Sequence, residues 1–291
     1  MQTGSVVQLW RYPVKSMAGE AIAVAQVDPG RGIAGDRAFA VIDVETGTVA
    51  SAKHPRKWNK LLDYKATMVD GHVHIELPDG TRLDPSESDA DQRLSAVFKR
   101  PLRMSSTPPR QATYEEYNAT DDSAKAEPLS VGAGTGTFFD FAPIHLVTTS
   151  TLARLQELLP ESCVDRARFR PNLVIDTGDA AGFVENAWNG HLLAVGSEVK
   201  LCVVFTCPRC VMTTLAQDGL PADPAILRAA ADHNKQWFPL LGKKLPTVGM
   251  YATVVRGGTI RTGDAVRLEG TSPLRRVGAF FHAAKRAIRR S

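Results

Sequence analysis

Short β-branched and aromatic runs alternate with tight-turn signals in residues 5–80 of the chain. The apolar runs lie at residues 6–12, 21–27, 38–43, 66–69 and 72–77. Pro-Gly, Gly-Asp and Asp-Gly steps separate several of these runs, and such dipeptides favour tight turns. Many short strands joined by tight turns are typical of barrels and sandwiches, whereas βαβ units need a helix between strands. The pattern therefore predicts a mainly β fold.

Helical patterns interrupt the strands at three places. Apolar residues at helical spacing predict a helix within residues 84–100. A second helix is predicted to be capped by Ser150 or Thr151, and residues 222–234 are helical by propensity. We therefore expect an α+β fold that is mainly β, with helices flanking the strands.

Composition divides the chain into four parts. Residues 1–103 hold the N-terminal strands, and residues 104–136 are rich in Ser, Thr, Pro, Asp and Gly, which indicates a linker or long loop. Residues 137–270 alternate strands and helices, and residues 271–291 form a basic tail with apolar residues at helical spacing. We expect an N-terminal barrel-like domain, a linker, a second barrel domain and an amphipathic tail.

Positive charge is concentrated in the tail. The formal net charge is +4, and residues 271–291 hold six Lys or Arg residues and no acid. Without those six the rest of the chain carries −2, because +4 less six is −2. The body of the protein is therefore not expected to bind nucleic acid. The tail fits a membrane surface, an acidic partner such as a ferredoxin-like donor, or a terminal helix packed on the body.

The sequence also indicates a compartment. No apolar window of about 18 residues predicts a transmembrane helix, and the N-terminus lacks the regions of a secretory signal. Four cysteines are too few and too clustered for a disulfide framework. We expect a cytoplasmic protein, with peripheral membrane contact only through the tail.

Cys207-Pro208-Arg209-Cys210 is the motif that most constrains function. A zinc site would need two further ligands at suitable spacing, and an iron–sulfur cluster would need four thiolates. A thioredoxin-like redox pair would stand at a helix N-terminus in a βαβ context, whereas Val-Met-Thr-Thr follows here and favours a strand or turn. The interpretation of the two cysteines as buried apolar side chains fits poorly with the Pro and the Arg that stand between them. The alternative that remains is one thiolate on a soft metal that is held mainly by something else.

Such a metal would need groups for an anionic cofactor, and the sequence offers several at predicted strand ends. Lys15 follows the first strand, Arg37 follows the Gly35-Asp36 turn, and Arg170 and Asn172 precede another strand. Lys and Arg side chains at such positions can grip a phosphate.

In order along the chain, these motifs resemble the MOSC family, which is named after the C-terminal part of molybdenum cofactor sulfurase. The resemblance is to the subgroup with the mitochondrial amidoxime reducing component and its bacterial counterparts. The motifs that carry it are Leu9-Trp10-Arg11-Tyr12-Pro13-Val14-Lys15-Ser16, Gly35-Asp36-Arg37, Phe139-Asp140, Pro143-Ile144-His145, Phe169-Arg170-Pro171-Asn172, Cys207-Pro208-Arg209-Cys210 with Thr213-Thr214, and Gly257 to Asp264.

The resemblance implies a molybdenum cofactor, with molybdenum bound to a pterin dithiolene and to Cys210, the residue expected to be catalytic. It implies that Lys15, Arg37 and Arg170 grip the pterin and its phosphate. Asn172, Thr148 and Thr151 would be further cofactor contacts, and Arg209 would hold Cys210 as a thiolate.

The implied activity is reduction of N-hydroxylated compounds such as hydroxylamines and amidoximes. No fused iron–sulfur domain is expected, because the chain lacks the cysteines for one. Electrons would then come from a separate ferredoxin-like protein or flavoprotein. Two other functions stay open: a sulfur carrier with a persulfide on Cys210, and a protein that binds or delivers the cofactor without turnover.

Overall fold

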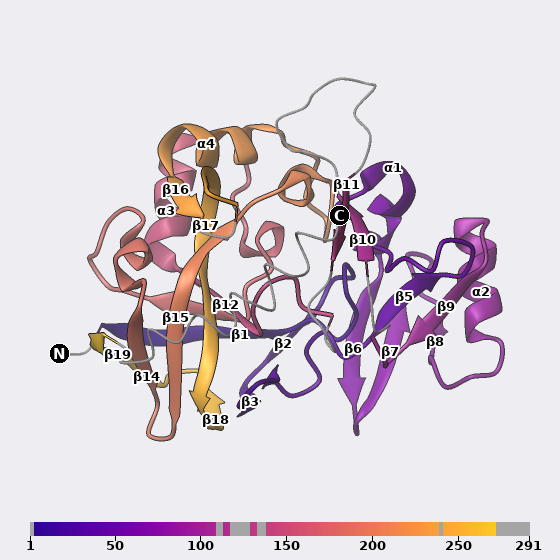
Figure 1. The fold of residues 1–291 in the computed structure, drawn as a ribbon, viewed down its shortest axis with the longest axis horizontal. Helices are drawn as coiled ribbons and strands as arrows, with labels where there is room; N and C mark the ends of the chain where they lie inside the picture. Colours follow the sequence, from indigo (N-terminus) through magenta and orange to yellow (C-terminus); the bar gives the residue numbers. More distant parts are fainter. Residues whose placement is uncertain (1–2, 109–112, 117–128, 133–137, 239–240, 272–291) are drawn as a thin grey trace.

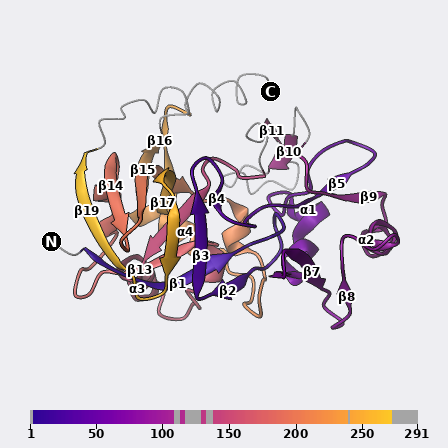
Figure 2. The same cartoon turned by 90° about the horizontal axis from the view of Figure 1, so that it is seen from below.

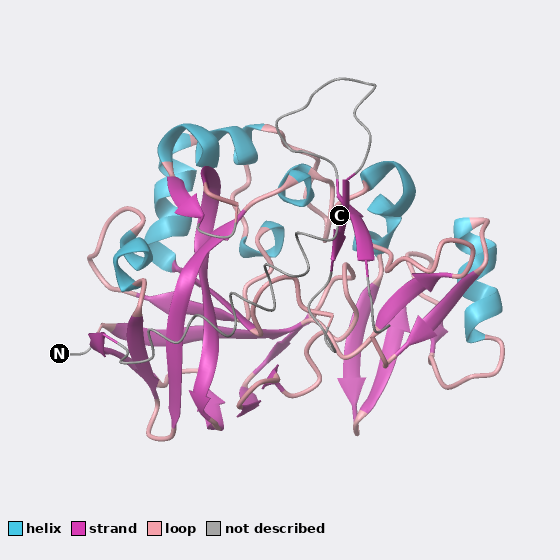
Figure 3. Cartoon of the chain, viewed as in Figure 1, coloured by secondary structure: helices cyan, strands magenta, loops and turns pink. Residues whose placement is uncertain are grey.

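The computed structural model describes residues 3–108, 113–116, 129–132, 138–238 and 241–271. Figure 1 shows a barrel formed mostly by the later part of the chain, with smaller N-terminal sheets beside it. Figure 3 shows strands in most of both regions and helices around them, which confirms the mainly β fold with flanking helices. The predicted tail lies outside the described residues, apart from Thr271.

Seven strands close into the barrel. Their order around it is β12 (Ile144–Thr148), β13 (Leu173–Asp176), β1 (Gly4–Arg11), β19 (Ala265–Thr271), β14 (His191–Val195), β15 (Val199–Pro208) and β17 (Lys243–Arg256), which returns to β12. β12 and β13 run parallel, and the other neighbours are antiparallel. Figure 2 shows these strands arranged around a common interior.

The barrel closes where β12 meets β17, with His145 opposite Tyr251. Gly249 permits this close approach, because its φ is +79° and a Cβ there would collide with the Leu146 carbonyl and the His145 ring. The interior holds a continuous apolar cluster that includes Val6, Leu146 and Leu201. A side chain at position 249 would therefore force apart the seam that positions His145.

The barrel takes strands from both ends of the chain, because β1 pairs with β13 and β19. β2 (Glu20–Ile22) pairs with β1, and β3 (Val24–Asp28) lies between β4 (Gly32–Ile33) and β18 (Gly258–Arg261). The domain boundaries predicted from composition stay predictions. The N-terminal segment nevertheless contributes apolar side chains such as Leu9 and Val27 to the barrel interior.

The smaller N-terminal region has its own core. Its sheets are β5 (Ala40–Asp43) with β9 (Leu102–Ser105), and β6 (Lys65–Val69) with β7 (His72–Glu76) and β8 (Arg82–Leu83). Its helices are α1 (Pro55–Trp58), η1 (Asn59–Asp63) and α2 (Ala90–Phe98). Trp58, Tyr64 and Leu94 are among the buried side chains that join these elements. α2 confirms the helix predicted within residues 84–100.

A hairpin occupies part of the segment predicted to be a linker or loop. β10 (Thr113–Glu116) and β11 (Leu129–Gly132) pair antiparallel. Tyr114 is buried in a cluster with Ile42 and Phe138, so apolar burial fixes β10 although the surrounding composition favours a loop.

Helices cover one end of the barrel. α3 (Thr149–Leu158) and α4 (Ala225–His233) pack together over β12, β13 and β17, with Leu155, Ile226 and Val248 in a shared cluster. Both match predicted helices, but the cap predicted at Ser150 or Thr151 is wrong: Thr148 is the N-cap residue of α3, and its side chain accepts from the Thr151 amide. The shorter elements are η2 (Arg166–Arg168), η3 (Val184–Trp188), η4 (Val211–Thr214) and β16 (Lys235–Phe238). No helix among the described residues is long and apolar enough to cross a membrane.

Candidate functional site

Asp140 lies between two lysine ammonium groups from the N-terminal part of the chain. Lys15, in the turn after β1, donates to Asp140 Oδ1 at 2.5 Å and to the Phe138 carbonyl at 3.1 Å. Lys53, just before α1, lies 3.2 Å from Asp140 Oδ2. Both lysine side chains are buried. The carboxylate therefore bridges two cations where the N-terminal region meets the barrel.

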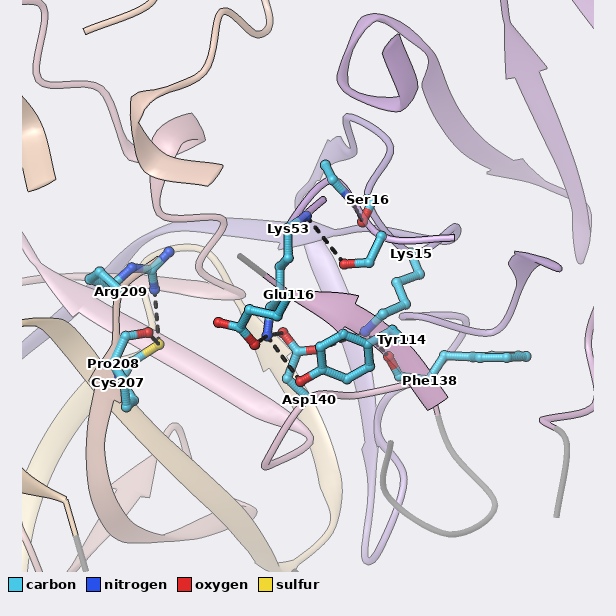
Figure 4. A network of polar contacts seen from close by, with 12 residues as sticks. Lys15, Ser16, Lys53, Tyr114, Glu116, Phe138, Asp140, Cys207, Pro208 and Arg209 are labelled. Atoms are coloured by element: carbon cyan, nitrogen blue, oxygen red, sulfur yellow. Dashed lines mark hydrogen bonds and ion pairs between the residues drawn. The ribbon is translucent and has the colours of Figure 1, made fainter. Parts of the chain in front are cut away.

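Lys53 also reaches the β10 hairpin. Its ammonium donates to the Tyr114 hydroxyl at 3.1 Å and to Glu116 Oε2 at 3.3 Å. Lys15, Lys53, Tyr114, Glu116 and Asp140 form what we call the lysine cluster; Figure 4 shows these side chains pointing toward one another. The sequence alone did not identify Lys53, Tyr114 or Glu116, because only the fold brings β10 to Lys53.

Charge pairing keeps the lysine cluster ionised. Burial alone would raise the pKa of Asp140, but Lys15 and Lys53 lower it well below its ordinary value. Burial lowers the pKa of Lys53, yet Asp140 and Glu116 outweigh that effect and raise it well above normal. The pKa of Lys15 is lowered by burial and by the nearby Lys53, against the pull of Asp140. Strongly shifted pKa values within one buried set of side chains are typical of functional sites.

Charged residues of the lysine cluster shift the pKa of the Cys210 thiol. Cys210 is the N-cap residue of η4 and is partly exposed. Burial raises the pKa of its thiol to about 11, while the charge of Lys53 opposes that rise and Glu116 adds to it. In the metal-free protein Cys210 is therefore a neutral thiol at pH 7, and Lys53 is the largest influence that favours its thiolate.

Arg209 hydrogen-bonds Cys207, and its charge also lowers the pKa of Cys210, though less than Lys53 does; its predicted role in holding Cys210 as a thiolate stays a prediction. Its Nη1 donates to the Cys207 sulfur at 2.8 Å, and its Nη2 donates to the Phe169 carbonyl at 3.0 Å. β15 runs through Pro208, and the Arg209 amide extends its ladder to the Pro246 carbonyl. Residues two apart on a strand share a face, so Arg209 lies beside Cys207.

Cys207 is the acidic thiol of the pair. Its side chain is buried, and burial would raise its pKa, but Arg209 and His145 lower the pKa to about 6. Tyr251 also hydrogen-bonds its sulfur. Figure 4 shows the Cys207–Arg209 pair to the left of the lysine cluster. The two cysteines of the motif therefore occupy different electrostatic environments.

Arg37 and Arg170 come together on Tyr12, as their predicted shared role requires. Their guanidinium carbons lie 4.8 and 4.3 Å from the centre of the Tyr12 ring. Arg37 also donates to Asp36 at 2.5 Å and to the Arg170 carbonyl at 3.4 Å. Arg37 and Arg170 have φ angles of 47° and 55°, a left-handed conformation that costs a non-glycine residue about 1–3 kcal/mol. Such strain is concentrated at functional sites.

Arg170 is a buried cation without a carboxylate partner among the described residues. Burial and the charge of Arg37 lower its pKa to about 10. It lines a small hollow with Trp10, Tyr12 and Arg166, whose guanidinium carbon lies 3.1 Å from the centre of the Trp10 ring. A buried and unpaired cation is unfavourable, so this position favours binding of an anion.

The Asn172 side chain hydrogen-bonds the backbone of two strands and the side chain of Arg37. Its Oδ1 accepts from the His145 amide at 3.1 Å and from Arg37 at 3.3 Å, and its Nδ2 donates to the Trp10 carbonyl at 3.3 Å. The side chain therefore joins β1, β12 and Arg37, and it links the barrel to the arginine pair.

Thr148 and Thr151 meet a carboxyl group that the sequence did not reveal. Both hydroxyls donate to Glu185 Oε2, at 2.7 and 2.6 Å. Burial raises the pKa of Glu185, against the hydrogen bonds from the two threonines. No hydrogen bond between described residues joins these threonines to Lys15, Arg37 or Cys210. The two predicted contact positions thus lie around Glu185, and their role as cofactor contacts stays a prediction.

The described side chains include no group of three or more His, Cys, Asp or Glu residues arranged to hold a metal ion. What they offer is the partly exposed thiol of Cys210, a buried charged cluster whose Lys53 acts on it electrostatically, and an arginine without a carboxylate partner.

Two family models match most of this chain, and curated proteins resemble it over most of its length. The family model for the MOSC domain matches residues 133–267, and the model for the MOSC N-terminal beta barrel domain matches residues 3–109. The human mitochondrial amidoxime-reducing component 1 is 28% identical over 299 residues, covering 92% of this chain and 84% of that protein. The human mitochondrial amidoxime reducing component 2 is 28% identical over 290 residues, covering 91% and 83%.

Among solved structures, the YUAD protein from Bacillus subtilis aligns with a TM-score of 0.42 and 9% identity, over 92% of this chain and 97% of that one.

Proposed function

Because this chain belongs to the MOSC family, we propose that it is a molybdenum-cofactor-dependent oxidoreductase that reduces N-hydroxylated compounds. Electrons would come from a separate donor protein. The names of its relatives, the amidoxime-reducing components, support this reaction class. The observation that carries the proposal is the partly exposed thiol of Cys210, on which the charge of Lys53 in the lysine cluster acts.

The residues present fit an anionic cofactor with a soft metal. A thiolate at Cys210 is a ligand of the soft type that molybdenum–dithiolene chemistry requires. The unpaired guanidinium of Arg170 and the neighbouring Arg37 fit a phosphate, because paired arginines bind phosphate through several donors at once. Lys15 would hold Asp140 in place or bind the cofactor directly when it arrives.

Reduction of a hydroxylamine or amidoxime breaks one N–O bond, consumes two electrons and two protons, and releases water. When bound, the cofactor supplies a metal that exchanges the oxygen atom and the electrons. Lys53 favours the thiolate form of Cys210, which metal binding requires. The carboxylate of Glu116 is 27% exposed and bonds Lys53, so it connects the cluster to solvent protons.

The sulfur-carrier alternative receives less support. A persulfide carrier needs a nucleophilic thiolate without a metal, whereas the pKa of Cys210 in the metal-free protein is raised to about 11; a bound metal would itself displace the thiol proton. Cys207 has the lower pKa, but it is only 2% exposed and cannot meet a protein partner directly.

Elemental analysis and turnover together test the proposal. Protein from a host that makes the cofactor is analysed for molybdenum, pterin and sulfane sulfur, and is then assayed with benzamidoxime and reduced methyl viologen. Stoichiometric molybdenum with turnover supports the enzyme, and molybdenum without turnover supports a binding or delivery protein. Sulfane sulfur without molybdenum supports a carrier and contradicts the proposal.

A further inference from the structure

The hairpin of β16 and β17 presents two lysines and a tryptophan to solvent on one face. We call Lys235, Trp237 and Lys244 the basic hairpin surface; all three are exposed, and Trp237 is 58% exposed. Trp237 pairs with Lys244 across the hairpin, and Lys235 is two residues from Trp237, so these three share one face. Phe238, on the opposite face, is buried.

Among the described residues, no carboxylate forms an ion pair with the lysines of this surface. The ion pairs of the described residues all involve other side chains. An exposed Trp among unpaired cations is unusual for a surface that meets only water, because Trp is highly buried on average and is enriched in protein interfaces.

The same hairpin reaches the cysteine motif through its backbone. Pro246 pairs with Lys235 on one side, and on the other its carbonyl accepts the Arg209 amide at 2.8 Å. The next residue, Thr247, pairs with Pro208. Lys244 precedes Pro246 by two residues, which is about 7 Å along a strand. A protein bound at this surface would therefore stand next to the loop that carries Cys210.

A layer of aromatic rings fills the space behind the hairpin. The Phe238 ring lies 5.3 Å from that of Phe205, and the Phe205 ring lies 5.6 Å from that of Tyr251. Tyr251 in turn hydrogen-bonds the Cys207 sulfur. Packed side chains thus connect the buried face of the hairpin to the cysteine motif without a gap.

We infer that the basic hairpin surface docks the electron donor, a small redox protein with an acidic face. The inference rests on the proposed function, which needs two electrons per N–O bond and therefore two encounters with a one-electron carrier. Lysines that face an acidic partner raise the encounter rate, and electron-transfer complexes are small and short-lived. The net charge of −2 outside the tail disfavours a general polyanion partner, so a protein with a matching acidic patch fits better than nucleic acid.

Charge reversal tests the docking surface in the holoenzyme. The double variant Lys235→Glu/Lys244→Glu is compared with Lys60→Glu/Lys65→Glu, whose lysines are exposed in the N-terminal region. The donors are a reduced acidic [2Fe–2S] ferredoxin, a reduced acidic flavodoxin and reduced methyl viologen. In the hairpin variant, KM for the protein donors is expected to be at least tenfold higher at low salt. That KM is also expected to depend less on salt concentration, because the electrostatic attraction of the donor is lost. The rate with methyl viologen, and all rates of the control variant, are expected to stay unchanged.

Direct titration separates failure of docking from failure of the proposed function. Oxidised ferredoxin or flavodoxin is titrated into wild-type protein and into the hairpin variant at low salt, which requires no turnover. Binding that is lost only in the hairpin variant supports the docking surface even if benzamidoxime is not reduced. Equal binding or equal KM in both, or hairpin-dependent binding only to anionic vesicles or single-stranded RNA, would overturn the inference.

Discussion

Arg209 Nη1 lies 2.8 Å from the sulfur of Cys207, so the cation inside the Cys-x-x-Cys motif belongs to the first cysteine. Cys210, the second cysteine, lies instead in the field of Lys53. The motif therefore combines an acidic, buried sulfur with a partly exposed, weakly acidic one. A soft metal would compete with a proton at Cys210 while the pair of Cys207 and Arg209 stays intact.

The first prediction concerns ionisation of the cysteines. In metal-free protein, one thiolate is expected to form near pH 6, because Arg209 and His145 stabilise the Cys207 anion. The ultraviolet absorbance of thiolate, followed against pH, measures this. The signal is expected to persist in Cys163→Ser and to vanish in Cys207→Ser. Titration of every cysteine near the ordinary value of 9.0 would contradict it.

The second prediction follows from the same shift through proton linkage. The folded-state pKa of Cys207, about 6, lies below the ordinary 9.0, so the unfolded chain binds more protons between these values. The stabilisation is complete above pH 9 and is lost as the pH falls toward about 6. Denaturant unfolding at a series of pH values should show this slope in wild-type protein and in Cys202→Ser, but not in Cys207→Ser. An identical slope in all three proteins would refute the assignment.

The third prediction uses the unpaired guanidinium of Arg170. Inorganic phosphate is expected to stabilise the metal-free protein, since an anion compensates this buried charge. At a hundredfold excess over Kd the gain is about 2.7 kcal/mol, readable as a rise in Tm. Arg170→Gln should lose most of this gain. The control Arg154→Gln, which alters an exposed pair with Glu157, should keep it. If phosphate stabilises both variants equally, the anion does not bind at Arg170.

The fourth prediction concerns Lys53. Lys53→Met is expected to destabilise the protein by about 2 kcal/mol, below the full cost of an unpaired buried charge, because Asp140 keeps Lys15. It should also lower molybdenum occupancy, because Cys210 loses the charge that favours its thiolate. Lys57→Met removes a more exposed pair with Glu115 and should cost less than about 1 kcal/mol. Denaturant unfolding and metal analysis of the two variants measure these effects. Equal losses of stability and of molybdenum in both variants would contradict the prediction.

Local patterns in the sequence were sufficient for much of the fold. The strand runs and the helices α2, α3 and α4 follow from periodicity and propensity, which are short-range signals, although α3 is capped by Thr148 and not by Ser150 or Thr151. The closure of the barrel did not follow, because the pairing of β1 with β13 and β19 joins distant parts of the chain. No local signal specifies such pairing.

The site was only partly predictable for the same reason. Lys15, Arg37 and Arg170 could be identified because motifs surround them, and the structure brings Arg37 and Arg170 onto one tyrosine ring. Lys53 and Glu116 sit in unremarkable local sequence and meet only through the fold. The partner of Arg209 depended on whether β15 extends through Pro208, and composition favoured a loop there.

Molybdenum content of Cys210→Ser protein tests the central claim most directly. Wild-type, Cys210→Ser and Cys163→Ser proteins are purified from a host that makes the cofactor, and the ratio of molybdenum to folded protein is measured. The account predicts molybdenum in the wild-type and Cys163→Ser proteins and its loss, together with benzamidoxime turnover, in Cys210→Ser protein of unchanged fold. Full molybdenum content and turnover in Cys210→Ser would contradict it.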